Sequence, residues 1–448
     1  MRALWRRLSA AWRADAAAFA SMVFAVLMLG LFPLYVDRAG YSEMTAAKRS
    51  CFLFCCALYG LMLVAAALYN RRQGKLRRAL CCLGQPAAVC LLLFGLFACL
   101  SWLTAPQRAA FTAADGLFYQ LLLLASALVL AYCGRWQQGY LTVAATAMLL
   151  TSLLAVLQLA GGNPFGLYPP GRSYADGGLY YVGSFLGTVG NIDLLASYSC
   201  LILPLLLFGA PLLPWRRRWL LYLAAASGLA VMLASGVSAG PLAVALTCCL
   251  FGPLSLPPRW RRRLWLAAAF LLLLLLIAAW LYDGAETGMF WELSRLLHGE
   301  VNDSFGSSRV LIWRDALDDA EGMRRWLLGS GPGTRALHFS TLFERVSAAG
   351  VPLRAYVTNA HSQYLDLLLE NGLAGLLCYL AALVAAAWRC RRRLVVDPVL
   401  RALAAGLFAY LLQGAFLSAY ILTAPLFWLL FGLLLAYLRS CALPQPAV

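Results

Sequence analysis

A short segment around residue 361 combines an imidazole with two carboxyl groups. His361 lies in the run Thr358-Asn359-Ala360-His361-Ser362, and Asp366 and Glu370 follow it, four residues apart. Four residues make about one helical turn, so both carboxyl groups share one helix face. Imidazole exchanges a proton near neutral pH, which makes His361 a candidate general base. A lone His is more often structural, and Glu370 is equally suited to brace the break at Asn371-Gly372.

Arginines in the polar segments are candidate ligands for an anion. Arg309 opens a predicted helix over 309–317, where the helix dipole disfavours a cation, so a ligand role would explain its position. Several guanidinium groups that converge on one cavity suit phosphate or pyrophosphate, because each binds two oxygens at once. We favour this role for Arg309 and Arg172. Ordinary ion pairs are favoured for Arg324, Arg325 and Arg345, and an ordinary surface position remains open for Arg309.

Two further motifs belong to the candidate set. Gly329-x-Gly331-x-Gly333 could cradle phosphate through backbone amides, although a turn between helices explains it better. Asn191 or Asp193 is expected to cap the helix that follows Gly190, with Asp193 facing the cavity. The sequence has no Walker loop, His-Glu-x-x-His, EF-hand loop or Asp-x-Asp. We therefore assign no metal and no cofactor, and expect neither an ATPase nor a metal-dependent nucleotide-sugar transferase.

Membrane-spanning helices must position these residues. The chain is 62% hydrophobic and 12% charged, about half the usual charged fraction of a soluble domain. Apolar runs of about 20 residues cross the hydrocarbon core as helices. We predict an all-α polytopic protein with about twelve spans in one membrane domain, 1–448. The runs lie at about 17–36, 50–69, 86–103, 115–132, 139–160, 191–209, 217–234, 238–256, 264–282, 362–387, 399–418 and 420–438, the last two forming a tight hairpin.

Charge predicts the orientation of these runs. Basic clusters occur within 2–13, before the first run, and within 71–78, 216–218, 259–263 and 389–393, after the second, sixth, eighth and tenth runs. Positive residues mark cytoplasmic loops and attract anionic lipid, so both termini are predicted on the cytoplasmic side of the cell membrane. The net charge of +17 then reflects orientation, and no nucleic-acid partner is expected.

Two polar segments are predicted outside the membrane. Residues 161–190 are rich in Gly, Pro and Tyr, which specify turns. Residues 283–359, between the ninth and tenth runs, are long enough for two or three short helices, including one near 337–345. The large segment and the start of the tenth run together contain every histidine, which places the predicted chemistry at the outer face.

Several motifs together resemble the O-antigen ligase and polymerase superfamily. The most specific is His361-Ser362-x9-Gly372-x-x-Gly375, and the resemblance covers roughly 140–390. The segments Phe32-Pro33-Leu34-Tyr35 and Asn163-Pro164-Phe165-Gly166 resemble its Gram-positive branch. The other matching motifs are Gly190-Asn191-Ile192-Asp193, Ser308-Arg309 with Trp313, and Gly329-x-Gly331-Pro332-Gly333.

This resemblance implies a metal-independent, GT-C-like glycosyltransferase. Such an enzyme moves a glycan from an undecaprenyl-pyrophosphate carrier to an acceptor hydroxyl on a glycan, wall or lipid acceptor at the outer membrane face. His361 would act as base and Arg309 would hold pyrophosphate. Arg172 or Arg314 would assist, and Asp193, Glu370, Gly331 and Gly333 are assigned to substrate binding.

Two positions depart from the family pattern, and other functions stay open. The turn Ser235–Gly240 lacks an Arg that many ligases carry, and Cys378 replaces a small or aromatic residue. Ligase and polymerase activities both fit the sequence. A lipid-linked glycan flippase or other transporter is the alternative, but it should carry polar groups at the midplane of several runs. An inactive scaffold in an assembly complex is a third reading, and the oligomeric state is undetermined.

Overall fold

The protein is a mostly helical bundle with very little β-structure. The computed structural model describes residues 10–72, 85–113, 115–176, 184–286, 288–320, 322–338, 340–346 and 352–441. Two small antiparallel sheets occur within these residues, β1 Phe185–Leu186 with β2 Gly190–Asn191, and β3 Thr341–Val346 with β4 Pro352–Val357. The basic cluster within 2–13 lies partly outside the described residues, and that within 71–78 lies mostly outside them.

Eight helical segments in the described residues are long and apolar enough to cross a membrane. Kinks or short 3-10 and π-helical turns divide several of them, as at Pro33 in the first. They are Ala16–Leu34 (α2 Ala16–Val26, η1 Leu27–Leu31, α3 Phe32–Leu34), Gly40–Asn70 (η2 Gly40–Glu43 and most of α4 Met44–Arg72), α5 Pro86–Thr104, α7 Gly139–Leu159, Ile192–Leu212 (α9 Ile192–Gly209, η5 Ala210–Leu212), α10 Trp215–Ala234, α12 Pro258–Trp280 and α17 Gln363–Cys390.

Four shorter apolar helices complete the bundle. They are α6 Leu117–Cys133, Ala239–Ser255 (α11 Ala239–Phe251, η6 Gly252–Ser255), α18 Pro398–Gln413 and α19 Ala424–Ser440. Each of the twelve predicted runs overlaps one of these twelve segments. The prediction of a multi-pass membrane protein is confirmed, whereas twelve crossings remain a prediction because four helices are short.

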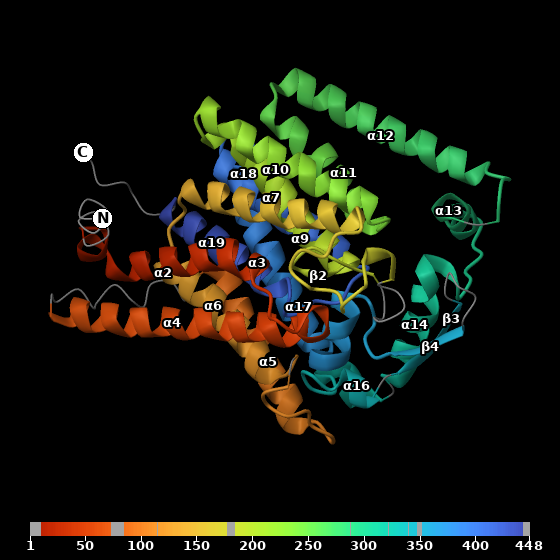
Figure 1. Ribbon diagram of the computed structural model, residues 1–448, viewed down its shortest axis with the longest axis horizontal. Helices are drawn as coiled ribbons and strands as arrows, with labels where there is room; N and C mark the ends of the chain where they lie inside the picture. Colours follow the sequence, from red (N-terminus) through yellow and green to blue (C-terminus); the bar gives the residue numbers. More distant parts are fainter. Residues whose placement is uncertain are drawn as a thin grey trace.

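The polar elements gather at one end of the bundle. Helix α2 begins and α19 ends at the left of Figure 1, and α12 runs along the top from the middle to the right. At the right lie α13, α14, α16 and the β3–β4 hairpin, all from the predicted outer segment 283–359. The helices of that segment are α13 Met289–Leu297, α14 Phe305–Asp319, α15 Met323–Leu328 and α16 Arg335–His338.

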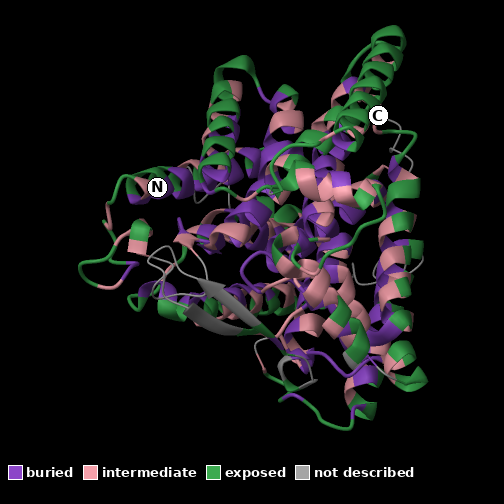
Figure 2. Cartoon of the chain, turned by 90° about the vertical axis from the view of Figure 1, so that its right-hand side faces the viewer, coloured by how far each residue is buried: buried purple, intermediate pink, exposed green. Residues whose placement is uncertain are grey.

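Burial varies strongly from helix to helix. The segment containing α9 is 78% buried and packs against α18 and α10, whereas α12 is 6% buried at the edge of the bundle. At Gly406 of α18, a side chain would collide with the carbonyl oxygen of Leu201, so glycine permits this close approach to α9. Exposed residues cover the outer sides of the peripheral helices (Figure 2).

Two local predictions were wrong. The helix near 337–345 ends at His338, and Thr341–Val346 instead forms strand β3, with Phe343 paired to Ala355. Its threonine, phenylalanine and valine favour a strand, and β4 supplies the partner. The predicted tight hairpin between the last two runs is a longer connection, 414–423, because α18 ends before Gly414 and α19 begins after Thr423.

Candidate active site

His361 occupies a strained turn directly before α17. Its backbone φ of +45° lies in a region that residues other than Gly rarely adopt. Its backbone N–H donates to Asn359 Oδ1 at 3.1 Å, and Ser418 Oγ donates to the same oxygen at 3.0 Å. Backbone strain of this kind costs about 1–3 kcal/mol and is concentrated at functional sites. The connection 414–423 therefore helps to hold the His361 turn.

Ala360, the residue before His361, is held by hydrogen bonds from α14 and α17. The N–H of Ala360 donates to Asp366 Oδ1 at 3.0 Å, and its carbonyl accepts from Trp313 Nε1 at 2.9 Å. The Trp313 ring also lies 6.3 Å from the ring of Phe416. Helix α14, helix α17 and the 414–423 connection thus meet around the imidazole. Asp366 acts here as a backbone anchor.

Arg309 lies beside a second strained segment. Gly306, Ser307 and Ser308 have φ values of +62°, +60° and +63°, so the right-handed part of α14 begins at Arg309. Arg309 donates from Nε to the carbonyl of Phe416 at 3.1 Å and from Nη1 to that of Gly306 at 2.6 Å. Within the described residues, the non-glycine positions with positive φ are Ser307, Ser308 and His361. The strain therefore surrounds the two predicted catalytic residues.

Electrostatics couple these two residues to Asp193. Burial lowers the pKa of Arg309, while the charges of Asp193 and Glu292 oppose this change. Burial and then the charge of Arg309 lower the pKa of His361 below its usual 6.5, against Asp193 and Asp366. His361 Nδ1 is buried and has no hydrogen-bond partner among the described residues. A neutral imidazole of this kind can accept a proton at pH 7.

Asp193 reaches this region from the start of α9. Asn191 caps the helix, because its Oδ1 accepts from the N–H of Leu194 at 2.9 Å, and the choice between Asn191 and Asp193 falls on Asn191. The carboxylate of Asp193 is in the first turn, and its carbonyl accepts from Gln413 Nε2 at 3.4 Å. Its carboxylate is therefore free of the capping role.

The two predicted helper arginines are in ion pairs nearer the surface. Arg172 lies 3.8 Å from Asp176 with its side chain 40% exposed. Arg314 lies 2.8 Å from Asp303 with its side chain 54% exposed. Arg309, by contrast, forms no ion pair with any described carboxylate. The helper roles of Arg172 and Arg314 remain predictions.

The glycine segment 329–333 contacts α17 at its break. The N–H of Gly331 donates to the carbonyl of Glu370 at 2.9 Å, and the N–H of Gly333 donates to Glu370 Oε1 at 3.0 Å. Ser101 Oγ donates to the same Glu370 carbonyl at 2.5 Å. These donors satisfy groups that the broken helix leaves unpaired inside the bundle. Glu370 accepts from both amides, so a phosphate would have to displace it. Phosphate binding by Gly331 and Gly333 stays a prediction.

Two glycines allow the segment and the helix break to approach closely. Gly372 has a φ of +67°, and a side chain there would collide with the carbonyl oxygen of Leu327. Gly329 has a φ of +77°, and a side chain there would collide with the carbonyl oxygen of Glu370. The family-type spacing from His361 to Gly372 thus has a packing reason.

Gly372→Ala is expected to destabilise the protein by about 3 kcal/mol, because it combines a left-handed strain with overpacking. Thermal unfolding of the detergent-solubilised protein measures the change. Gly60→Ala is the matched control, since a Cβ at Gly60 in α4 meets nothing within 4 Å. Equal melting of the two variants would contradict the close fit.

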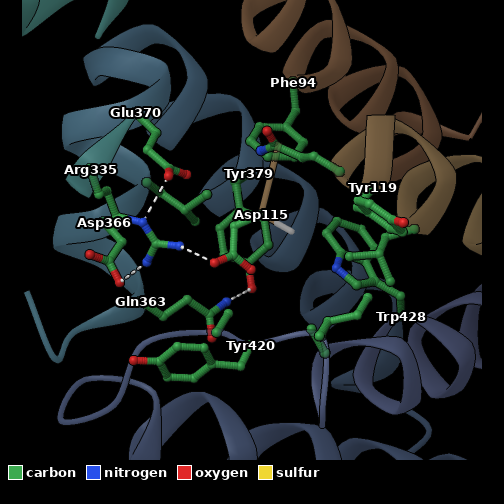
Figure 3. A pocket seen from close by; sticks show the side chains of 16 residues that line it. Phe94, Asp115, Tyr119, Arg335, Gln363, Asp366, Glu370, Tyr379, Tyr420 and Trp428 are labelled. Carbon is green, nitrogen blue, oxygen red and sulfur yellow. Dashed lines mark hydrogen bonds and ion pairs between the residues drawn. The ribbon is translucent and has the colours of Figure 1, made fainter. Parts of the chain in front are cut away.

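Arg335 is a site residue that the sequence did not single out. It is 9% exposed and pairs through Nε with Glu370 Oε1 at 2.8 Å, through Nη1 with Asp366 Oδ2 at 2.9 Å, and through Nη2 with Asp115 Oδ2 at 3.3 Å (Figure 3). Burial acts to lower the pKa of Arg335, but the three carboxylates outweigh it and raise this pKa further. Buried carboxyl groups beside a membrane need a cationic partner. In the sequence, Asp366 and Glu370 were therefore the signal that an arginine should lie next to them.

The family comparison agrees with the motifs. The model of the O-Antigen ligase family matches residues 220–380. None of the curated proteins matches the chain. The matched region runs from α10 into α17, and includes the strained segment of α14, the glycine segment and Arg335. The part of the chain that this family model matches includes both His361 and Arg309, which supports the resemblance to the O-antigen ligase superfamily.

Proposed function

We propose that the protein transfers a glycan from undecaprenyl pyrophosphate to an acceptor hydroxyl at the outer face of the cytoplasmic membrane. The observation that carries this proposal is that His361 and Arg309 both lie at strained backbone held by the 414–423 connection, where no described carboxylate forms an ion pair with Arg309. The site lies at the end of the bundle opposite the start of α2, whose predicted side is cytoplasmic (Figure 1). The superfamily domain supports glycan processing in general.

The two residues suit the two halves of this reaction. The acceptor oxygen forms a bond to the anomeric carbon as His361 takes its proton. The bond from that carbon to the pyrophosphate oxygen breaks, and undecaprenyl pyrophosphate leaves with the electron pair. Negative charge grows on the leaving oxygens, where the fork of Arg309 stabilises it. Asp193 lies close enough to hold both cationic forms in place.

Arg309→Ala is expected to lower the transfer rate by about 10²–10³-fold, the usual effect of losing one preorganised donor to a developing negative charge. Arg309→Lys should recover little, because an ammonium group lacks the bidentate fork. Transfer from lipid-linked glycan in membranes measures both variants. Arg295→Ala is the control, since Arg295 forms an exposed ion pair with Glu300. Wild-type rates in Arg309→Ala would remove the pyrophosphate role.

The transfer rate should fall with acid through the pKa of His361. That pKa is below 6.5, so the neutral base survives at pH 7 and is lost only as pH falls further. The Asp193 carboxylate raises this pKa, so Asp193→Asn is expected to move the acid limb of kcat/KM to lower pH. A limb that stays in place, or moves to higher pH, would contradict the coupling of these two residues.

Deleting the gene distinguishes the remaining reactions. Long glycan chains that accumulate on the lipid carrier indicate a ligase, and single repeat units indicate a polymerase. Lipid-linked glycan that accumulates only on the cytoplasmic side would favour the flippase alternative. Unchanged lipid-linked and surface glycans would exclude all three activities for this protein.

A further inference from the structure

A pocket lies next to the His361 turn and takes no part in the steps above. It opens among α5, α6, α17, α19 and the 414–423 connection, and Figure 3 shows its lining. Its volume is about 90 Å³, which holds roughly six to nine water molecules. This is the scale of one sugar ring with its hydroxyl groups. We call it the acidic pocket.

The charge of the acidic pocket disfavours a phosphate. Asp115, Asp366 and Glu370 line it together with a single guanidinium, that of Arg335. Arg49 adds a second cation at the edge, 5.9 Å from the ring centre of Tyr119. Carboxylates still outnumber guanidinium groups by three to two. Arg335 is already paired with all three carboxylates, so the guanidinium that lines the pocket is not available to an anionic pyrophosphate.

The walls of the acidic pocket suit a hydroxyl-rich ring. Tyr119, Tyr420 and Trp428 provide flat aromatic surfaces, and Gln120 and Gln363 provide amides. Aromatic faces pack against the C–H surfaces of a ring, while carboxylate and amide oxygens accept hydrogen bonds from its hydroxyls. An apolar pocket with a few convergent polar groups is the usual form of a small-molecule site.

The 414–423 connection contributes both to the acidic pocket and to the surroundings of Arg309. In the 414–423 connection, the carbonyl of Phe416 binds Arg309, whereas Tyr420 lines the pocket. On α17, Asp366 lines the pocket and also accepts the N–H of Ala360, the residue before His361. Asp366 therefore connects the lining of the pocket to the turn that carries the proposed base.

We propose that the acidic pocket binds the sugar ring that carries the acceptor hydroxyl. The acceptor ring would enter between the aromatic walls, beside the Asp366 side chain that anchors the His361 turn, while Arg309 holds the pyrophosphate on the far side of the Phe416 carbonyl. This inference rests on the proposed transfer function. It assigns the two substrates to separate groups of residues, so it predicts that Tyr420 and the other pocket residues away from the His361 turn affect the binding of the acceptor alone.

The test measures separate KM values for the two substrates in membranes. Both are extracted from cells that lack the gene, as the lipid-linked glycan fraction and the acceptor glycan fraction. Tyr420→Ala is expected to raise KM for the acceptor fraction at least tenfold and to leave KM for the lipid-linked glycan unchanged. Tyr420→Phe keeps the ring and should stay within threefold of wild type. Tyr356→Ala is the control, because Tyr356 in β4 is 70% exposed.

An unchanged acceptor KM in Tyr420→Ala, or an equal rise for both substrates, would overturn the acidic pocket as the acceptor site. Asp115→Asn is a second variant that preserves side-chain shape and should likewise raise only the acceptor KM; it serves if Tyr420→Ala fails to fold. Failure of the proposed function looks different, because wild-type membranes would then transfer no glycan at all.

Discussion

His361→Asn is expected to abolish glycan transfer while the protein remains folded in the membrane. Loss of a general base lowers rates by about 10²–10⁴-fold. Asn is the suitable replacement, because it tolerates the left-handed backbone that His361 adopts at φ +45°. An Ala there would add backbone strain to the loss of the imidazole. The measurement is surface glycan in a deletion strain that expresses the variant.

The control for this variant is a second histidine in the same outer segment. His298 stacks on Trp280 at 4.2 Å, far along the chain from the His361 turn, and its replacement by Asn should leave transfer intact. Equal membrane levels and equal melting temperatures show that folding is preserved. Normal surface glycan with His361→Asn would end the case for an imidazole base.

The predicted helices follow from simple physical patterns. Apolar runs of about 20 residues are forced into helices by the membrane, so each of the twelve runs overlaps a helical segment of the structure. The full length of the 414–423 connection was missed because this segment is also mostly apolar, and apolar content alone does not mark where a helix ends. That connection supplies the Phe416 carbonyl, Ser418 and Tyr420 to the site.

The site residues could be predicted from the sequence only where they belong to one local sequence motif. The His361 turn and Arg309 each lie within a recognisable local motif. Arg335 belongs to no such motif, since its partners come from the loop before α6 and from α17. The glycine segment shows the opposite case. Its pattern suggested an anion cradle, and in the structure the anionic group nearest to it is the Glu370 carboxylate of the same chain.

Arg335→Ala is expected to destabilise the protein by about 3–5 kcal/mol, the cost of leaving buried charges without their partner. Three carboxylates, from Asp115, Asp366 and Glu370, would lose their common cation. Thermal unfolding in detergent and membrane yield measure the loss. Arg295→Ala removes an exposed pair and should cost at most about 1 kcal/mol.

A compensated variant shows whether charge or packing causes this loss. Arg335→Met combined with Asp115→Asn, Asp366→Asn and Glu370→Gln removes all four charges of the cluster while keeping similar volumes, and replacement of a buried ion cluster by neutral groups is often neutral or stabilising. We therefore expect it to melt well above Arg335→Ala. Glycan transfer should nevertheless stay below wild type, because Asp366 also anchors the turn of His361 through Ala360, and a neutral amide oxygen accepts that N–H less strongly than a carboxylate. If the compensated variant melts no higher than Arg335→Ala, then the packing of the Arg335 side chain, and not its charge, stabilises the protein.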